Sequence, residues 1–345
     1  MHLSDSPSNP PSARRTVPLA WFVVGIVVAA GVSVAGVAVY LAVQGSSSHG
    51  GPGSLSVTDD LGRNVSVPND PARVVVLGPS IMDTMYRLGL RGHVVGVDCY
   101  AASFGGLSDD YSSDQIALWN LTSSMCVEVE PSFDAEGLLA LGPQLVLAAT
   151  IVPTATVEQF SITYHIPVVF LQPATLGGIV LDVQLLGRVF DVTPAATALE
   201  DSLTGELTSA ASFQEGLTNN GTAFPTVLVT YSADANGYWT FGPGTFGESL
   251  IELASGASIS ANATGSWPEV SGEQALASDP EFVVYGTGFG INETSYSVGP
   301  FWTQLTAVQD GRVVGMDSNY FTEPDPTMVL LGLPELIAIL HPGAP

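Results

Sequence analysis

The sequence predicts an α/β protein of two similar lobes, each a mainly parallel sheet flanked by helices, joined by a long helix and preceded by one transmembrane helix. The first observation is a repeat: residues 136–150 and 273–287 align without a gap and share a leading Glu, a Leu-Ala pair, a Pro, a Val and a closing Thr. In each copy, apolar residues at helical spacing run to the Pro, which cannot continue a helix, and a short apolar strand follows. Two such units predict two α/β lobes with a ligand cleft between them. Chance similarity stays open, because Leu, Ala and Val are common in this chain.

Two further observations complete the fold class. The stretch from Leu176 to about Gly216 has a helical pattern, with Thr193-Pro194 as a fresh N-cap and first turn, and its length predicts a stiff connector between the lobes. Residues 17–43 carry no charge. The chain is therefore divided into a tail (1–16), an anchor (17–44), a Ser/Gly-rich linker (45–54), an N-terminal lobe (55–172), a connecting helical backbone (173–222) and a C-terminal lobe (223–345).

The uncharged N-terminal segment predicts a membrane anchor. A helix needs about 20 apolar residues to span a bilayer, whereas the apolar core of a cleavable signal has roughly 7 to 15. Arg14 and Arg15 precede the segment and the next basic residue is Arg63, so we expect the tail inside the cell and the main domain outside. A cleaved signal peptide is the alternative, and no Cys follows the segment to carry a lipid.

The N-terminal lobe is predicted from alternating residues, apolar runs and helix caps. Ser80 with Asp83 predicts a capping-box start for a helix that stops at Gly89, and a later helix begins at about Thr154. The first repeat copy adds a helix and a strand between them. The remaining expected elements are a hairpin over 57–67 and strands over 73–77, 94–97 and 167–171.

The C-terminal lobe follows the same rules. Thr245 with Glu248 predicts a capped helix that ends at Gly256, and a closing helix is expected from Thr327 to Leu340. The second repeat copy lies between these two helices. The other expected strands are 227–231 and 312–316.

Composition and charge restrict the function. A hydrophobic content of 46% excludes a disordered chain, and a net charge of -25 without any Lys argues against binding to nucleic acid or an anionic membrane surface. Carboxyl groups have ordinary pKa values near ~4, so most of this charge disappears in acid. We therefore expect the extracellular part to work in acid, since a salt-adapted protein would carry many more charged residues.

Cysteines and glycosylation sequons fit an oxidising, extracellular compartment. Cys99 and Cys126 are expected to form a disulfide at one rim of the N-terminal lobe, with two free buried thiols as the alternative. Each Asn-x-Ser/Thr sequon is weak evidence alone, because sequons also occur by chance. The five candidate glycan acceptors are Asn64, Asn120, Asn220, Asn262 and Asn292.

Eight segments of the chain are informative by their order and spacing: 57–63, 73–80, 88–90, 94–97, 166–170, 244–256, 267–274 and 307–313. Together they resemble the substrate-binding proteins of ABC importers for cobalamin, haem and ferric siderophores. The resemblance covers the chain from Leu55 to His341 and is strongest to the cobalamin-binding members around 267–280. It implies a two-lobed fold with a long helix between the lobes and a small opening motion.

This resemblance also implies partners. In that family one Glu on each lobe docks onto Arg residues of a permease, and the matching positions here are Glu136 and Glu273, the first residues of the two repeat copies. The alternative is that both are ordinary acidic residues at helix N-termini, where the helix dipole favours them. A permease and its ATPase are thus the expected protein partners.

The ligand is expected to be a metal chelate or corrinoid, and no cofactor is predicted. Aromatic residues in loops after strands, or beside segments that face the cleft, suit a large planar or macrocyclic ligand, although each one singly is more often a core residue. No Arg falls in these loops to bind an anionic chelate, and His93, His165 and His341 form no cluster for free metal. The candidate ligand contacts are Tyr100, Phe104, Tyr238, Trp239, Phe241, Trp267, Tyr320 and Phe321.

The leading interpretation is a membrane-anchored, single-pass extracytoplasmic binding protein that delivers an iron chelate or a cobalamin-type corrinoid to an ABC permease, and no enzyme activity is expected. A chelatase-like enzyme on a similar fold is one alternative, although no nucleophile–base pair, His cluster or phosphate loop stands out. A surface receptor that kept this fold without a transporter is the other.

Overall fold

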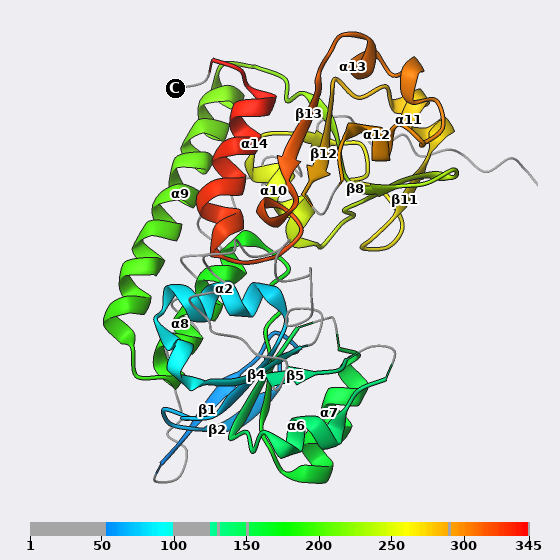
Figure 1. Cartoon of the computed structure of the whole chain (residues 1–345). Helices are drawn as coiled ribbons and strands as arrows, with labels where there is room; N and C mark the ends of the chain where they lie inside the picture. The colour runs from blue at the N-terminus through cyan, green and yellow to red at the C-terminus, as the bar shows by residue number, and fades with distance from the viewer. Residues whose placement is uncertain (1–52, 99–124, 130–131, 150–151, 289–290, 344–345) are drawn as a thin grey trace, which may run out of the picture. The chain divides into compact units, whose positions relative to one another are not determined.

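The computed structural model describes residues 53–98, 125–129, 132–149, 152–288 and 291–343 (Figure 1). These residues belong to one compact unit of the chain, 46–345. The predicted tail and anchor and nearly all of the linker lie outside the described residues. Within the described ranges, no helix combines the length and the apolar character needed to cross a bilayer.

A five-stranded parallel sheet forms the core of the N-terminal half. Its strands are apolar and buried on both faces, as is usual where helices cover a parallel sheet. In spatial order they are β5 (Cys126–Val127), β4 (Val94–Asp98), β3 (Val74–Leu77), β6 (Leu145–Ala148) and β7 (Val168–Phe170). The predicted hairpin is confirmed as the antiparallel pair β1 (Ser54–Thr58) and β2 (Asn64–Pro68), whereas the two-residue β5 was not predicted.

The helix that follows β3 starts differently from the prediction. In α2 (Pro79–Arg87) the N-cap is Gly78, without a side-chain cap, so the Ser80–Asp83 capping box was wrong. Gly78 has a φ of 152°, and a Cβ there would lie 2.6 Å from the Cβ of Ala149, so this position requires glycine. The next residue, Pro79, is the first residue of the helix, where proline is favoured. Asp83 forms an ion pair with Arg87 instead. A turn of 3₁₀ helix, η1 (Leu90–His93), then leads to β4.

The predicted helical connector consists of two helices that pack against each other, α8 (Leu176–Val189) and α9 (Thr193–Asn219). The helical conformation is interrupted between them at Asp191, whose φ is 52°. The N-cap of α9 is Val192, so Thr193 is its first residue rather than the predicted cap. At the α8–α9 contact a Cβ on Gly187 would collide with Ala196, so the glycine permits the close approach.

The C-terminal half contains a six-stranded mixed sheet. Strands β8, β10, β12 and β13 pair in parallel, and β9 and β11 add an antiparallel edge that was not predicted. The main order is β11 (Glu269–Ser271), β9 (Gly237–Thr240), β8 (Thr226–Ala233), β12 (Phe282–Thr287) and β13 (Val313–Asp317), with β10 (Ala257–Ser258) also beside β8.

The two repeat copies fold alike. In the first, α6 (Ala135–Ala140) leads into β6, which pairs with β3; in the second, α11 (Gly272–Ser278) leads into β12, which pairs with β8. Each repeat strand therefore lies beside the first parallel strand of its own sheet. Together with the covering helices, this confirms the predicted α/β class, whereas the exact domain boundaries stay predictions.

The remaining helices close the C-terminal half. Thr245 caps α10 (Phe246–Leu253) by accepting a hydrogen bond from the Glu248 amide, as predicted. The predicted closing helix begins as a π-helical turn, η5 (Met328–Gly332), and continues as α14 (Leu333–Leu340), which packs beside α9 (Figure 1). The shorter elements are α7 (Thr154–Tyr164), α12 (Glu293–Tyr296), η3 (Trp302–Gln304), α13 (Thr306–Gln309) and η4 (Ser318–Tyr320).

Candidate functional site

An aromatic cluster lies on the C-terminal half, with Trp267 as its outermost member. The indole is 46% exposed, and its ring centroid lies 5.5 Å from that of Phe246, 5.7 Å from Phe241 and 6.3 Å from Tyr231. Phe321, directly after η4, contacts Phe241 at 6.1 Å. Trp267 thus presents an exposed aromatic surface on a base of buried or half-buried rings.

Backbone contacts hold Trp267 in this position. The Gly242 amide donates to the Ser266 carbonyl at 2.8 Å, and the Thr240 amide donates to the Pro268 carbonyl at 3.1 Å. A Cβ on Gly242 would collide with the Gly265 carbonyl, so the close approach of the two segments depends on glycine. The tryptophan is therefore presented by a segment tied on both sides to the end of β9.

The predicted aromatic contacts divide into three groups. Phe241 and Phe321 are buried beneath Trp267, while Trp239 and Tyr320 are half-buried. Burial and the neighbouring acidic residues raise the pKa of Tyr320. Tyr100 and Phe104 lie outside the described residues.

Tyr238 requires a correction. Its side chain is fully buried in a separate core cluster, 6.0 Å from the Trp302 ring, and its hydroxyl donates to the Pro300 carbonyl at 2.9 Å. Burial raises the pKa of Tyr238 to about 12. Strand alternation explains this placement: Tyr238 and Trp239 are neighbours on β9, so their side chains point to opposite faces.

Two members of the cluster were missed. Tyr231 is the last residue of the strand that was predicted over 227–231 and lies within β8, and Phe246 directly follows the Thr245 cap of α10. Their positions at a strand end and a helix start were visible signals. The pairing that brings both to Trp267 was not, because Trp267 lies on a loop between two short strands, β10 and β11.

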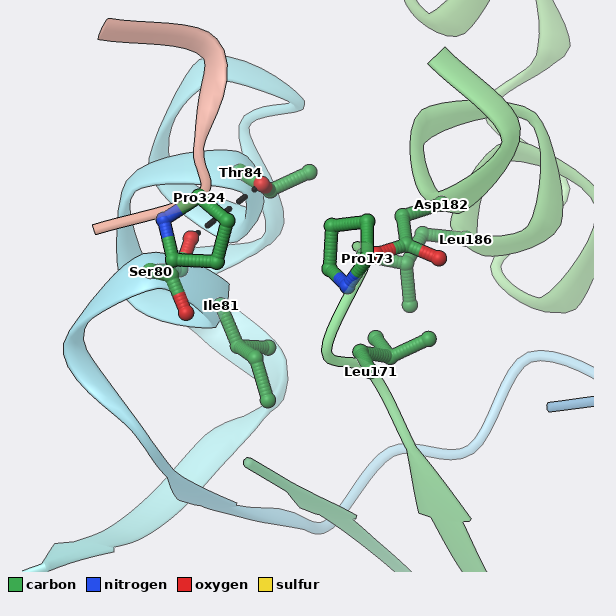
Figure 2. A pocket seen from close by; sticks show the side chains of 8 residues that line it. All are labelled: Ser80, Ile81, Thr84, Leu171, Pro173, Asp182, Leu186 and Pro324. Atoms are coloured by element: carbon green, nitrogen blue, oxygen red, sulfur yellow. Dashed lines mark hydrogen bonds between the residues drawn. The ribbon is translucent and has the colours of Figure 1, made fainter. Parts of the chain in front are cut away.

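A small cavity lies at the carboxyl ends of β3 and β7, where ligands bind in many open α/β sheets. Figure 2 shows Ser80 and Thr84 of α2 on one side and Pro173 and Asp182 on the other. The space open to the centre of a water molecule is about 10 Å³, enough for roughly one water-sized group. The full lining is Ser80, Ile81, Thr84, Leu171, Pro173, Asp182, Leu186 and Pro324.

Asp182 is the notable group of this cavity. It is 8% exposed, and burial, then the nearby Asp60 charge, raises its pKa well above the ordinary value. Burial raises the pKa of Asp60 itself to about 6, and the charge of Asp59 adds to this rise. A hydrogen bond from the Gln172 amide to Asp60 opposes the rise but does not cancel it. Neither acidic residue was identified from the sequence, because a single Asp in a helix (Asp182) or in a hairpin turn (Asp60) gives no sign that it is buried.

Polar contacts join α2 to the segment before η5. Arg87 donates to the Thr327 hydroxyl at 2.8 Å and to the Asp83 carboxylate at 2.7 Å, and Thr327 donates to Asp83 at 3.2 Å. Asp325 accepts from the Met328 amide at 3.0 Å, and burial, followed by the Asp83 charge, raises its pKa well above the ordinary value. The contacts of Arg87 and Asp83 with Thr327 therefore link α2 of the N-terminal half to the C-terminal half.

The two Glu residues of the repeat occupy equivalent exposed positions. Glu136 lies in the first turn of α6 and Glu273 in the first turn of α11. Asp134 and Ser271 cap these helices, so the caps do not require either Glu side chain. Among the described contacts, neither carboxylate forms an ion pair or a hydrogen bond. Both are available to an external cation, and their docking role stays a prediction.

The predicted disulfide lies partly outside the described residues, because Cys99 is not among them. Cys126 in β5 is not a free thiol, and it pairs in register with Val97 of β4, two residues before Cys99. We therefore expect both cysteines to resist alkylation in the native protein and to appear as one linked peptide in non-reducing peptide mapping. Alkylation of both native thiols would contradict the pairing.

The sequons and the histidines add little to the site. Asn64, Asn220, Asn262 and Asn292 are exposed, and Asn120 lies outside the described residues. Glycan attachment to any of them stays a prediction. Within the described ranges, no group of three or more His, Cys, Asp or Glu side chains could hold a metal ion.

Comparisons with known proteins identify the family. The family model for periplasmic binding proteins matches residues 74–320. The cobalamin-binding protein of Halobacterium salinarum is 30% identical over 284 residues, which cover 80% of this chain and 72% of that protein.

Two solved structures show the same fold. A Fe³⁺-hydroxamate transport system protein of Saccharomonospora viridis gives a TM-score of 0.66 at 21% identity, covering 84% of this chain and 99% of the other. The vitamin B12-binding protein of Vibrio cholerae gives 0.61 at 21%, covering 79% and 98%. The chain therefore belongs to the periplasmic binding protein family.

Proposed function

We propose that this protein is an extracytoplasmic substrate-binding protein that captures a corrinoid of the cobalamin type, or a similar chelate, and delivers it to an ABC permease. The observation that carries the proposal is Trp267, exposed on a base of aromatic rings. An exposed indole supported in this way offers a flat apolar surface for a macrocyclic ligand. The Halobacterium salinarum relative, named as a cobalamin-binding protein, supports a corrinoid over an iron chelate.

The proposal includes the predicted location and partners. Residues 17–44 would anchor the protein in the membrane, with the tail inside and the binding domain outside. Glu136 and Glu273 would dock onto Arg residues of the permease, which works with its ATPase. Their exposure, and the absence of a partner for either among the described contacts, support this role.

The two alternatives differ in what happens to the ligand. A chelatase-like enzyme would change the chelate, whereas a binding protein releases it unaltered. A receptor without a transporter would bind the ligand but find no permease. Permease and ATPase genes beside this one would favour transport over the receptor.

Native mass spectrometry of the purified extracellular domain tests the proposal directly. We expect a co-purified corrinoid, or binding of added cyanocobalamin in a one-to-one complex that is recovered chemically unchanged after incubation. A converted product would favour the enzyme. Failure to bind cyanocobalamin, haemin, ferrioxamine B and ferric citrate would contradict the proposed function.

Trp267→Ala is expected to weaken ligand binding without unfolding the domain. Removing the indole deletes the exposed stacking surface, and truncation of a central aromatic contact commonly costs about 1–3 kcal/mol, a roughly tenfold to hundredfold loss of affinity. Isothermal titration calorimetry measures this without relying on tryptophan fluorescence. Ile162→Ala on α7, which removes a side chain that is 75% exposed, is the control and should leave affinity unchanged. Unaltered affinity in Trp267→Ala would exclude the aromatic cluster as the binding surface.

A further inference from the structure

Asp182 is a buried carboxyl that the fold leaves without a partner. It is 8% exposed, and no hydrogen bond or ion pair to it occurs among the described residues. A buried polar group without a hydrogen bond is costly, and native proteins rarely keep one unless water, an ion or a ligand satisfies it. Because Asp182 lines the cavity at the carboxyl ends of β3 and β7, its missing partner has room to enter there (Figure 2).

The hydroxyl groups across the cavity define what could enter. Thr84 already donates its hydroxyl proton to the Ser80 carbonyl at 3.3 Å. The Ser80 hydroxyl forms no hydrogen bond among the described residues, and it is only 4% exposed. Asp182 and Ser80 are therefore two polar side chains that line the same cavity from opposite sides, and neither has a hydrogen bond among the described residues (Figure 2).

The titratable groups around the cavity are mostly acidic. Asp60 acts on Asp182 directly, and Glu323 adjoins the lining residue Pro324. Asp325, on the other side of Pro324, is buried, which raises its pKa and disfavours its charged form. On α2, the charge of Asp83 is opposed by that of Arg87. A ligand that brought a carboxylate or another anion into this region would meet like charges without a free cation among the described lining residues.

We propose that Asp182, with Ser80, forms a polar subsite that binds a neutral or cationic hydrogen-bond donor of the ligand, such as the NH2 end of a primary amide. An NH2 group is about the size of the one water molecule for which the cavity has room, and its two N–H bonds can donate to the Asp182 carboxyl and to the Ser80 hydroxyl oxygen. This inference rests on the proposed function and refines it. The subsite would bind ligands that carry amide, hydroxyl or ammonium groups more tightly than ligands that present carboxylates.

The test compares four probes by calorimetry on the extracellular domain. Cyanocobalamin carries terminal amides and ferrioxamine B an ammonium, whereas haemin and ferric citrate present carboxylates. We expect the wild type to bind one of the first two at least tenfold more tightly than either of the last two. Tighter binding of haemin or ferric citrate would overturn the subsite but leave the proposed function standing. Failure of all four to bind would contradict both.

Two substitutions at one position separate hydrogen bonding from packing. Asp182→Leu keeps the branched side-chain shape but replaces both oxygens by methyl groups, so binding of the preferred probe should fall about tenfold, the usual scale for a buried polar group left unpaired. Asp182→Asn keeps a donor and an acceptor and should retain affinity within about threefold. Asp201→Leu, the same change at an exposed position of α9, is the matched control and should be neutral.

Thermal unfolding in the absence of ligand checks that the variants are folded. If Asp182→Leu does not fold, Ser80→Ala carries the test, with an expected loss of about threefold from one neutral hydrogen bond. Equal affinity in wild type and Asp182→Leu would contradict the subsite, as would equal affinity in wild type and Ser80→Ala when the Leu variant is unfolded.

Discussion

Reversing the charge at both Glu136 and Glu273 will abolish transport while leaving ligand binding intact. The two carboxylates lie exposed in the first turns of α6 and α11, one in each half, and neither has a partner among the described contacts. Truncating one member of a buried charge pair at an interface commonly costs ~2–5 kcal/mol. Arg in place of Glu adds repulsion between like charges, so the double variant should lose more.

The experiment pairs ligand titration with a permease assay. Single Ala variants should reduce association with the permease in detergent and uptake in vesicles, and Glu136→Arg with Glu273→Arg should eliminate both. Asp201→Arg with Glu215→Arg, two exposed acidic residues of α9, makes the same charge change elsewhere and is the control. Loss of ligand affinity in the Glu variants, with normal permease association, would refute the docking role.

The repeat shows what the sequence could predict. Each copy has a helix, a Pro that ends it and an apolar strand, and all three signals depend only on local residues. For the same reason the hairpin of β1 and β2 and the Thr245 cap were predicted correctly. The pairing of each repeat strand with β3 or β8, in contrast, joins segments that are far apart in the chain.

The errors arose where distant contacts decided the structure. Ser80 and Asp83 have the residue types of a capping box, yet Gly78 and Pro79 start α2, and Arg87 pairs with Asp83. Tyr238 and Trp239 are adjacent aromatic residues, and only the pairing of β9 with β8 and β11 determines which one is buried. No local pattern contains that pairing.

The candidate site was only partly predictable for the same reason. Trp267 was found because the family resemblance placed it beside the cleft. The burial of Asp182 was not found, since it arises where α8 meets α2 and the segment around Pro324, far apart in the chain. Sequence patterns report which face of a helix is apolar, but they do not report which polar residue that face leaves without a partner.

Acid should stabilise this protein. The chain carries a net charge of -25, and several buried carboxyls have raised pKa values: Asp182 and Asp325 well above the ordinary value, Asp60 to about 6 and Glu248 to about 7. A raised pKa means that the folded state holds protons that the unfolded state releases. The resulting stability is complete below the unfolded pKa near ~4 and is lost as the pH rises through the folded values.

Glu248 shows how large this effect of pH on the free energy of unfolding is. Its side chain is 5% exposed, one carboxylate oxygen has no partner among the described residues, and burial outweighs a hydrogen bond with Ser258, with Glu252 adding to the rise in pKa. A rise from 4.5 to about 7 corresponds to a loss of about 3 kcal/mol in the free energy of unfolding between pH 4.5 and pH 8. The exposed Asp234 and Asp279 have lowered pKa values, and their opposite contribution is lost only at lower pH, outside this window.

Scanning calorimetry of the extracellular domain at pH 4.5 and pH 8 measures the difference. We expect the midpoint of thermal unfolding to be higher at pH 4.5, by about 5–10 °C, because 1 kcal/mol shifts the midpoint of a domain of this size by roughly 2–4 °C. Glu248→Gln replaces the carboxyl by a neutral isostere, so it should raise the midpoint at pH 8 and change it little at pH 4.5. Glu215→Gln on the exposed side of α9 is the control and should leave both midpoints unchanged. If the domain unfolds between pH 3 and pH 4.5 yet stays intact at pH 7, function in acid is excluded, because the buried carboxyls would then not provide the stability that their raised pKa values require.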